Sequence, residues 1–436
     1  MTEGNPLRLM LRFSMPIIAS GIMSLSYTLA DSVIIGRILG VNAFAAIGAT
    51  AGLHWLVFSA FLGASHGFGV IFAQLFGKKD YEGLCRSCAT ALYLAVASGL
   101  IVGVLGIIFS RPMLSLLGTP VILMDDAATY LSWMYGGVII FFVMNLLNAA
   151  LRALGDSKTP MYALFFTSVL NIGLSLALIM PFGISGVAAA TLLSQFAACV
   201  YCLLALRRTG YFKRKWLIWD TGSAQALVKM GLPMGLRNLV SAGGGLIVQW
   251  YINGFGVVFV AGIAAALRMY NLLIVALGGF EGAVAVFTAQ NFGAAKYERV
   301  KKGISTGLWL MLSSSAVIMV FALLFGPTML RWFFDGDPAL IYAVLDVGIR
   351  KVNILALSLP LLCILILYRT ALESMAKPFF PTLSGFVEMG TRILLVTLFT
   401  PLIGEWGVYL SFGLGWMTAG ILLAVAYRLS SRSVLI

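Results

Sequence analysis

Charged residues are scarce in this sequence, and their scarcity excludes most classes of protein. Asp, Glu, Lys and Arg together make up 10% of the 436 residues, against about 25% in an average soluble domain. A soluble globule of this length needs a polar surface, so a soluble enzyme, a disordered chain and a nucleic-acid-binding domain are excluded. The 61% hydrophobic content and the mean hydropathy of +0.99 instead predict a polytopic membrane protein.

Cysteine and histidine are too few to build a disulfide framework or a metal centre. The five cysteines include two C-x-x-C pairs, Cys85/Cys88 and Cys199/Cys202, a spacing that can serve redox chemistry or half a zinc site. A zinc site needs four ligands, and the only two histidines lie on another segment. We interpret the cysteines as reduced packing residues and expect no metal centre and no cofactor. The sequence also lacks a phosphate-binding Gly-x-x-x-x-Gly-Lys loop.

Apolar runs long enough to cross a bilayer, whose core takes about 20 helical residues, occur twelve times. Helix satisfies the backbone polar groups within lipid, so the expected fold class is all-α. The expected spans are 13–37, 46–76, 88–110, 128–151, 161–181, 186–206, 230–253, 260–292, 304–326, 350–372, 380–402 and 406–427.

The longest break between spans contains the run RRTGYFKRKW and falls near the middle of the chain. It predicts an N-terminal six-helix lobe (1–206), a linker (207–229) and a C-terminal six-helix lobe (230–436). With the N-terminus inside, the inner segments carry 20 Lys and Arg residues and the outer segments five, Arg350 and Lys351 among them. Because cytoplasmic loops are enriched in Lys and Arg, both termini and the linker are expected to be cytoplasmic.

The two lobes look like copies of one another. The segment FAQLFGKKDYEGL (72–84) matches TAQNFGAAKYERV (288–300) at an offset of 216, and Pro16 matches Pro233 at an offset of 217. Six spans return the chain to the side on which it started, so the repeat is parallel, with its axis along the membrane normal. Two similar bundles suit alternating access better than they suit a channel or a scaffold.

Motifs in both lobes resemble the multidrug and toxic compound extrusion (MATE) family. They are ADSVIIGRILGVNAFAAIG (30–48), AQLFG and AQNFGAAKYERVKKG at the ends of the second spans of the two lobes, LRALGDSKTPM after the fourth span, and GFVEMGTRI (385–393). The last motif is similar to the branch related to bacterial drug efflux and DNA-damage-inducible members. The resemblance covers essentially the whole chain. It implies twelve helices in two bundles that export organic, often cationic, compounds in exchange for protons or sodium.

The sequence departs from the family pattern at three acidic positions. Many members carry an Asn followed four residues later by an Asp in the fifth span, whereas here Asn171 is followed by Ser175. The seventh-span Glu and the tenth-span Asp of sodium-linked members fall on Ser241 and near Leu362. These missing carboxylates favour protons over sodium as the coupling ion.

Three acids lie well within the expected spans, where an ionisable side chain costs roughly 2.5–3.5 kcal/mol on insertion scales. One of them, Glu388, is followed by Arg392 one helical turn later. The i,i+4 spacing places both side chains on one face of the helix. A structural ion pair is therefore expected between them.

The second of these acids, Asp31, has no such partner on its own helix. Arg37 comes six residues later, about 240° around a helix, so the two side chains face different ways. A carboxyl group in low dielectric can switch between a neutral protonated form and a charged form that holds a cation. We expect Asp31 to be the ion-coupling residue, taking H⁺ or Na⁺. The family resemblance places Asn171 nearest to it, with Ser175 as a further candidate.

The third acid, Glu281, lies in LGGFEGAVAVF within a span longer than a simple crossing requires. Irregular backbone is tolerated at membrane depth where it lines a cavity, and glycines flank this residue. No basic residue lies near Glu281 in the sequence. It is therefore a candidate for contact with a cationic substrate or with a coupling ion of the second lobe, the alternative being a structural buried acid.

Together these patterns favour a secondary antiporter, and not an enzyme, that exports amphiphilic cationic compounds in exchange for H⁺ or Na⁺. The alternative is a flippase or exporter of a lipid-linked or anionic metabolite, which unpaired Arg237, Arg268 and Arg369 would favour. A membrane-embedded enzyme would need a nucleophile–base set or metal ligands. The expected partners are a small-molecule substrate and membrane lipid, without nucleic acid. We expect a monomer in the plasma membrane of a bacterium or archaeon.

Overall fold

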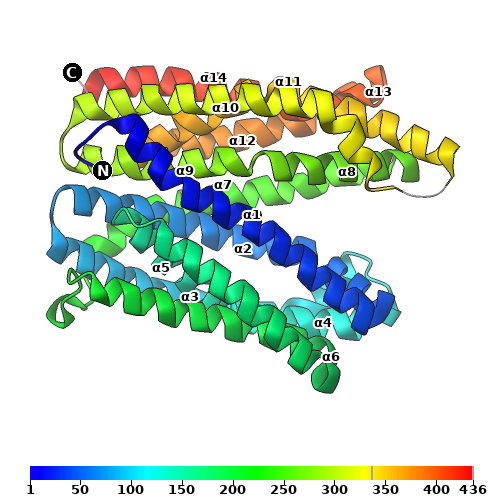
Figure 1. Cartoon of the computed structure of the whole chain (residues 1–436), viewed down its shortest axis with the longest axis horizontal. Helices are drawn as coiled ribbons and strands as arrows, with labels where there is room; N and C mark the ends of the chain where they lie inside the picture. Colours follow the sequence, from blue (N-terminus) through cyan, green and yellow to red (C-terminus); the bar gives the residue numbers. More distant parts are fainter. Residues whose placement is uncertain (335–336, 435–436) are drawn as a thin grey trace. The chain divides into compact units, whose positions relative to one another are not determined.

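The computed structural model describes residues 1–334 and 337–434, and within these ranges the chain is helical without β-strands. A 3₁₀-helix, η1 (Arg214–Trp216), and a π-helix, η2 (Leu395–Phe399), accompany the α-helices. The α-helices, labelled in Figure 1, are α1 (Pro6–Ile38), α2 (Gly40–Gly77), α3 (Tyr81–Leu116), α4 (Val121–Gly136), α5 (Val138–Ala153), α6 (Lys158–Arg208), α7 (Thr221–Asn253), α8 (Val257–Leu273), α9 (Val275–Gly293), α10 (Tyr297–Arg331), α11 (Pro338–Ser374), α12 (Phe379–Leu394), α13 (Thr400–Ile403) and α14 (Trp406–Val434).

The helices reproduce the twelve expected spans once their breaks are taken into account. The pair α4 and α5 is one span bent by 46°, and the pair α8 and α9 is one span bent by 44°. The 51-residue α6 contains two spans that meet at Gly183. The φ of +57° and ψ of −133° at this residue suit glycine, which has no Cβ to clash. Since α12, η2 and α13 together form the eleventh span, the prediction of twelve membrane helices is confirmed.

Side-chain packing divides the chain into two compact units. The first unit is Ala19–Gly235, and the second is Met1–Ile18 together with Leu236–Ile436. The start of α1 belongs to the second unit because Met10 and Phe13 share a hydrophobic core with residues of α9. These units follow contacts, whereas the lobes expected above follow the sequence repeat, so the two divisions differ at the starts of α1 and α7.

Close helix packing in the first unit depends on small residues. A Cβ on Gly67 of α2 would lie 2.8 Å from the Cα of Gly231 of α7, and one on Gly103 of α3 would lie 2.9 Å from the carbonyl oxygen of Tyr135 of α4. Both distances are too short for any other residue. Glycine therefore allows these backbones to approach as membrane helices commonly do.

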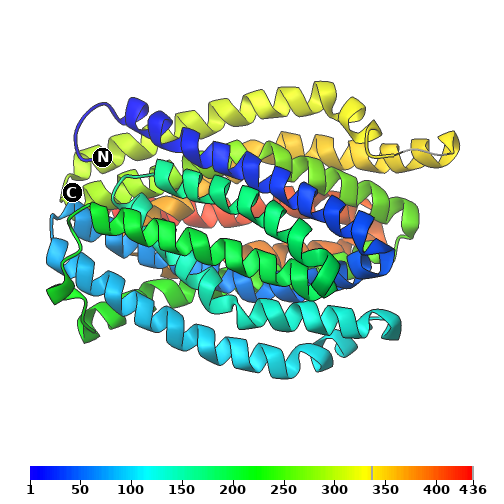
Figure 2. The same cartoon turned by 60° about the horizontal axis from the view of Figure 1, so that its bottom comes forward.

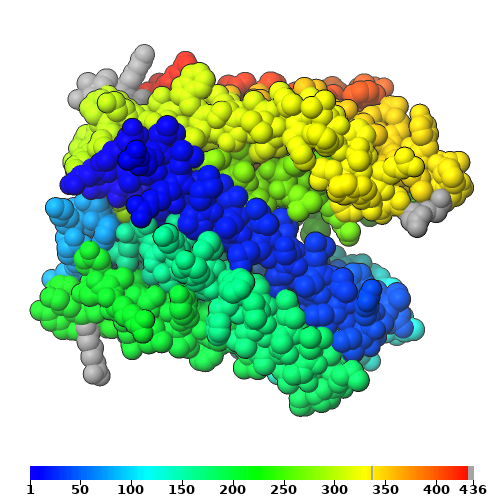
Figure 3. Space-filling view, in the orientation of Figure 1, coloured from blue at the N-terminus to red at the C-terminus, as the bar shows by residue number. Residues whose placement is uncertain are grey.

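In the second unit, α11 is the central helix. It packs against α8, α9, α10, α12 and α14, and Figure 2 shows the same bundle turned by 60°. The helix α10 covers this bundle and lies at the surface along its length (Figure 3). Its side chains Trp309, Val317 and Leu324 are 72%, 70% and 67% exposed. Large apolar side chains exposed in a row are expected where a helix faces lipid.

Candidate functional site

Asp31 is an acid without a basic partner. Its side chain on α1 is half-buried, and its Oδ1 atom is buried with no hydrogen-bond partner among the described residues. Arg37 is exposed further along the same helix. An ionised carboxyl group that is desolvated and unpaired is costly. Asp31 is therefore an acid whose charge no described residue balances.

Two tyrosines surround this acid. Tyr27, one turn earlier on α1, and Tyr130 on α4 both interact electrostatically with Asp31. Tyr27 also interacts with the side chain of Thr191 on α6. The two phenol hydroxyl groups that interact with this carboxyl group can donate or accept hydrogen bonds without carrying charge.

The residues Asn171 and Ser175 are buried on α6 next to the same threonine. Nδ2 of Asn171 donates to Oγ1 of Thr191 at 3.2 Å, and Oγ of Ser175 donates to Oδ1 of Asn171 at 3.3 Å. Asn171 and Thr191 are 20 residues apart, and the bend at Gly183 folds the second part of α6 back toward the first. The three residues predicted from the sequence are therefore connected through Tyr27 and Thr191.

Sequence reasoning missed the hydroxyl groups of this site. Tyr27 stands at the i−4 position from Asp31, where a side chain shares its helix face, so it could have been identified. Tyr130 and Thr191 come from other helices, and no sequence signal places them beside Asp31. Asp31 itself followed from its charge within an apolar segment.

Glu281 on α9 has no basic residue near it in the sequence, but the folded chain brings basic residues to it. The folded chain places it within electrostatic reach of Arg237 on α7 and of Arg369 and Glu373 on α11. The Thr370 hydroxyl faces the Glu281 carboxyl group but makes no hydrogen bond of ordinary geometry. Glu281 is therefore one member of a group of buried charges.

The other members of this group form ion pairs with one another. Arg237 pairs with Glu373. Glu388 accepts a hydrogen bond from Arg392 at 2.6 Å, the contact expected from the sequence, and another from Arg369 at 2.8 Å. Arg237 and Arg369, which lacked partners in the sequence analysis, are thus paired with acids in the folded chain. The role of Glu373 was missed because it comes near the end of a span.

Lys351 on α11 is a buried cation of the same unit. Its position in the sequence predicts an outer segment, but its side chain is 0% exposed. Its Nζ donates to the carbonyl oxygens of Val408 and Tyr409 at 3.1 and 3.3 Å, and lies 4.3 Å from the ring centre of Phe412. Carbonyl oxygens and an aromatic face stabilise a cation, so this lysine is satisfied without a carboxylate.

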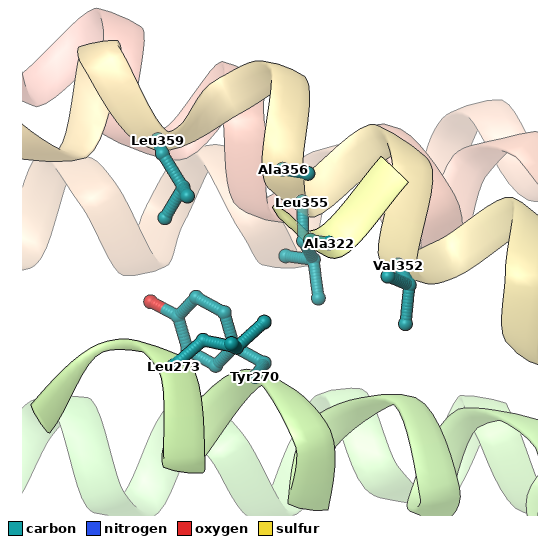
Figure 4. A pocket seen from close by; sticks show the side chains of 7 residues that line it. All are labelled: Tyr270, Leu273, Ala322, Val352, Leu355, Ala356 and Leu359. Atoms are coloured by element: carbon teal, nitrogen blue, oxygen red, sulfur yellow. The ribbon is translucent and has the colours of Figure 1, made fainter. Parts of the chain in front are cut away.

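A narrow apolar gap lies between α8, α10 and α11 beside these charges. Its volume is about 10 Å³, which is near the minimum for one water molecule, so it is too small for an organic substrate. The gap, drawn in Figure 4, is lined by Tyr270, Leu273, Ala322, Val352, Leu355, Ala356 and Leu359.

No metal centre is formed by the described parts of the chain. Within 1–334 and 337–434, no three His, Cys, Asp or Glu side chains are grouped so as to hold a metal ion. The five cysteines there are free thiols.

Helices that cross a bilayer twelve times define a polytopic membrane protein. The chain belongs to the MatE family, whose model matches residues 16–177 and 233–398. The two matches begin 217 residues apart, the offset that relates Pro16 to Pro233. One family domain in each half of the chain thus accounts for the sequence repeat.

Several curated relatives and solved structures are similar to this chain. A probable multidrug resistance protein of Bacillus subtilis, YpnP, is 29% identical over 78% of this chain and 77% of its own length. A protein of Shewanella oneidensis named FAD transporter is 26% identical over 90% of this chain and 86% of its own length. A MOP superfamily transporter from Pyrococcus furiosus shares the fold with a TM-score of 0.91 at 20% identity, covering 99% of this chain and 97% of that one. The protein is therefore a multi-pass membrane transporter of the MATE multidrug-efflux family.

Proposed function

We propose that the protein is a secondary antiporter that exports amphiphilic organic cations in exchange for protons by alternating access. The observation that carries this proposal is the carboxyl group of Asp31, which is desolvated and lacks a basic partner among the described residues. A proton and a cation both satisfy such a group, and they cannot do so together. Binding of one therefore excludes the other, as exchange requires.

Tyr27, Thr191, Asn171 and Ser175 are proposed to assist Asp31. Their hydroxyl and amide groups can reorient when the carboxyl group gains or loses charge, without breaking an ion pair. Sodium is the alternative coupling ion, with Asp31, Asn171 and Ser175 as candidate ligands. Protons are favoured because Ser175 stands where many family members carry a second carboxylate.

Glu281 is proposed as the acid of a second-lobe site. The neighbouring arginines are already bonded to Glu373 and Glu388, so Glu281 is the acid of this group without an ion pair among the described residues. The buried Thr370 hydroxyl beside it also lacks a hydrogen bond. Glu281 is therefore suited to contact a cationic substrate or a coupling ion, whereas the Glu388–Arg392 contact is proposed to be structural.

Export of an anionic or lipid-linked metabolite is the second candidate function. Arg268 lies eleven residues into α8 with its side chain exposed, and it makes no hydrogen bond or ion pair among the described residues. One relative is named an FAD transporter, and the Pyrococcus transporter is described as having a binding pocket of reverse polarity. An unpaired cation at such depth is expected where an anion is recognised.

Transport by purified protein in vesicles distinguishes these functions. A fluorescent organic cation, an uncharged analogue and a flavin nucleotide are offered under separately imposed proton and sodium gradients. The proposal expects export of the cation driven by the proton gradient. Transport of the flavin nucleotide alone would instead favour the second candidate, and transport that responds to neither gradient would refute antiport.

The proposed orientation places both termini and the linker in the cytoplasm. The excess of Lys and Arg in the segments on that side supports this orientation. The protein is also proposed to act as a monomer. A single cysteine placed at position 213 of a variant without native cysteines should react with a membrane-impermeant maleimide only after the cells are opened. Labelling of this cysteine in intact cells would show that the linker is outside and that the proposed orientation is wrong.

A further inference from the structure

The segment between α6 and α7 lies along the flank of α3. The ring of Tyr211 stacks on Tyr81 at the start of α3, with centroids 4.6 Å apart. Further along, the ring centre of Trp219 lies 6.2 Å from that of Tyr93, and the backbone nitrogen of Asp220 donates to Oγ1 of Thr90 at 3.0 Å. The segment is therefore attached to one helix from its first aromatic residue to its last.

The far end of this segment reaches the level at which α3 begins to expose apolar side chains. Tyr81 and Tyr93 are twelve residues apart, about 18 Å along a helix. The exposed apolar surface of α3 begins at Leu92 and Tyr93, which are 41% and 52% exposed, and continues toward the other end of the helix. At 36 residues, α3 is longer than the roughly 20 that a bilayer core needs. Trp219 thus packs where the exposed apolar surface of this helix begins.

Charged and apolar side chains are ordered along this segment. Lys213 and Lys215 come first, exposed, with their Nζ atoms 5.0 and 5.3 Å from the ring centre of Trp216. Leu217, Ile218 and Trp219 follow and are 41%, 47% and 49% exposed. The apolar side chains therefore lie nearest the lipid-facing surface of α3, and the lysines lie farther from it.

Asp220, which ends the segment, does not neutralise the positive charge of the two lysines. Asp220 accepts a hydrogen bond from the backbone nitrogen of Ser223 at 2.6 Å at the start of α7. Hydrogen bonds from the side chain and backbone of Ser223 hold the pKa of Asp220 below its usual value. Its carboxylate is thus engaged at the N-terminus of α7, where a negative charge is favourable, and the two lysines keep a free positive surface.

We propose that this surface, formed by Lys213, Lys215, Leu217, Ile218 and Trp219, binds anionic phospholipid of the surrounding bilayer. The two ammonium groups contact headgroup phosphates, and the three apolar side chains pack against the acyl chains below them. Lysines beside tryptophan and aliphatic residues are the pattern of interfacial anchors. Because α7 begins directly after Asp220, the bound lipid holds the start of this helix at the membrane surface.

Fluorescence quenching by brominated lipids tests this proposal without any transport measurement. Purified full-length protein is reconstituted in phosphatidylcholine vesicles that contain, at equal mole fraction, either phosphatidylglycerol or phosphatidylcholine with brominated acyl chains. The Trp219 signal is the difference between the wild type and Trp219→Phe. We expect brominated phosphatidylglycerol to quench this signal more strongly than brominated phosphatidylcholine.

Two double variants decide whether the lysines cause that preference. Lys213→Gln/Lys215→Gln should lower the preference for phosphatidylglycerol by about fivefold per lysine, the equivalent of ~1 kcal/mol each. Lys78→Gln/Lys79→Gln removes the same charge from an exposed pair that follows α2, and it should leave the preference unchanged. Equal quenching of the Trp219 signal by both lipids in the wild type, or an equal loss in both double variants, would overturn the proposal. Neither result bears on the antiporter proposal, because no gradient or substrate is present.

Discussion

The two units hold their buried acids in opposite ways. In the first unit, Asp31 interacts with the hydroxyl groups of Tyr27 and Tyr130, and the ion pairs of the described residues leave it out. In the second unit, Glu373 and Glu388 are paired with three arginines. An acid among neutral groups can gain or lose a proton without breaking an ion pair. A buried acid that balances arginines cannot be replaced without cost, since loss of one partner leaves an unpaired charge.

The largest effect is expected from breaking the paired arrangement. Glu388→Gln leaves Arg369 and Arg392 without their shared carboxylate, and removal of one partner of a buried ion pair costs about 3–5 kcal/mol. Thermal unfolding in detergent should show this loss of stability. Glu298→Gln is the matched control, because its pair with Lys301 is exposed at the surface and contributes at most about 1 kcal/mol. Equal stability of the two variants would mean that the second unit does not depend on its ion pairs.

The next effect concerns the unpaired acid. Asp31→Asn resembles the protonated form, so the variant should fold and insert but lose gradient-driven export of an organic cation by roughly 100-fold, the upper range of a coupling free energy. Transport by purified protein in vesicles measures this loss. Asp126→Asn, an exposed acid of α4, should transport at the wild-type rate. Wild-type ion dependence in Asp31→Asn would place coupling elsewhere, with Glu281 as the next candidate.

A smaller effect is expected at Glu281. Like Asp31 it has no ion pair among the described residues, and like Glu388 it lies near arginines. If it contacts a cationic substrate, Glu281→Gln should lower transport of an organic cation by about tenfold and that of an uncharged analogue much less, since one charge–charge contact contributes on the order of 1.4 kcal/mol. Initial rates at matched expression and matched unfolding temperature measure the difference. An equal decrease for both compounds would show that Glu281 only balances Arg237 and Arg369.

The smallest effect should come from the neutral network around Asp31. Thr191→Val keeps the shape of the side chain but removes the hydroxyl that Asn171 and Tyr27 bind, a loss of about 1 kcal/mol per hydrogen bond. We expect an approximately fivefold decrease in proton-driven export. Thr191→Ser should restore most of the rate because it retains the hydroxyl. If valine and serine behaved alike, the network would be dispensable for Asp31.

The sequence predicted the helices of this fold better than it predicted which side chains of different helices lie together. Twelve spans followed from apolar runs, because a bilayer requires helices of a set length. The bend at Gly183 was anticipated only as a gap between spans five and six, since local sequence does not report how sharply a helix turns. Asp31, Asn171 and Ser175 were found from charge and family motif, whereas Tyr130 and Thr191 were not, because they come from helices other than that of Asp31.

By itself, the sequence determined that this chain is a membrane protein of two repeated halves with an acid buried in each, because hydropathy, charge and repetition are properties of the residues. Only the tertiary structure decided which of those acids lies among basic residues. Glu281 has no basic residue nearby in the sequence, yet folding brings Arg237 and Arg369 to it from α7 and α11, while Asp31 remains among hydroxyl groups. The physical reason is that electrostatic free energy depends on distances in space, which residues far apart in the sequence acquire only when the helices pack.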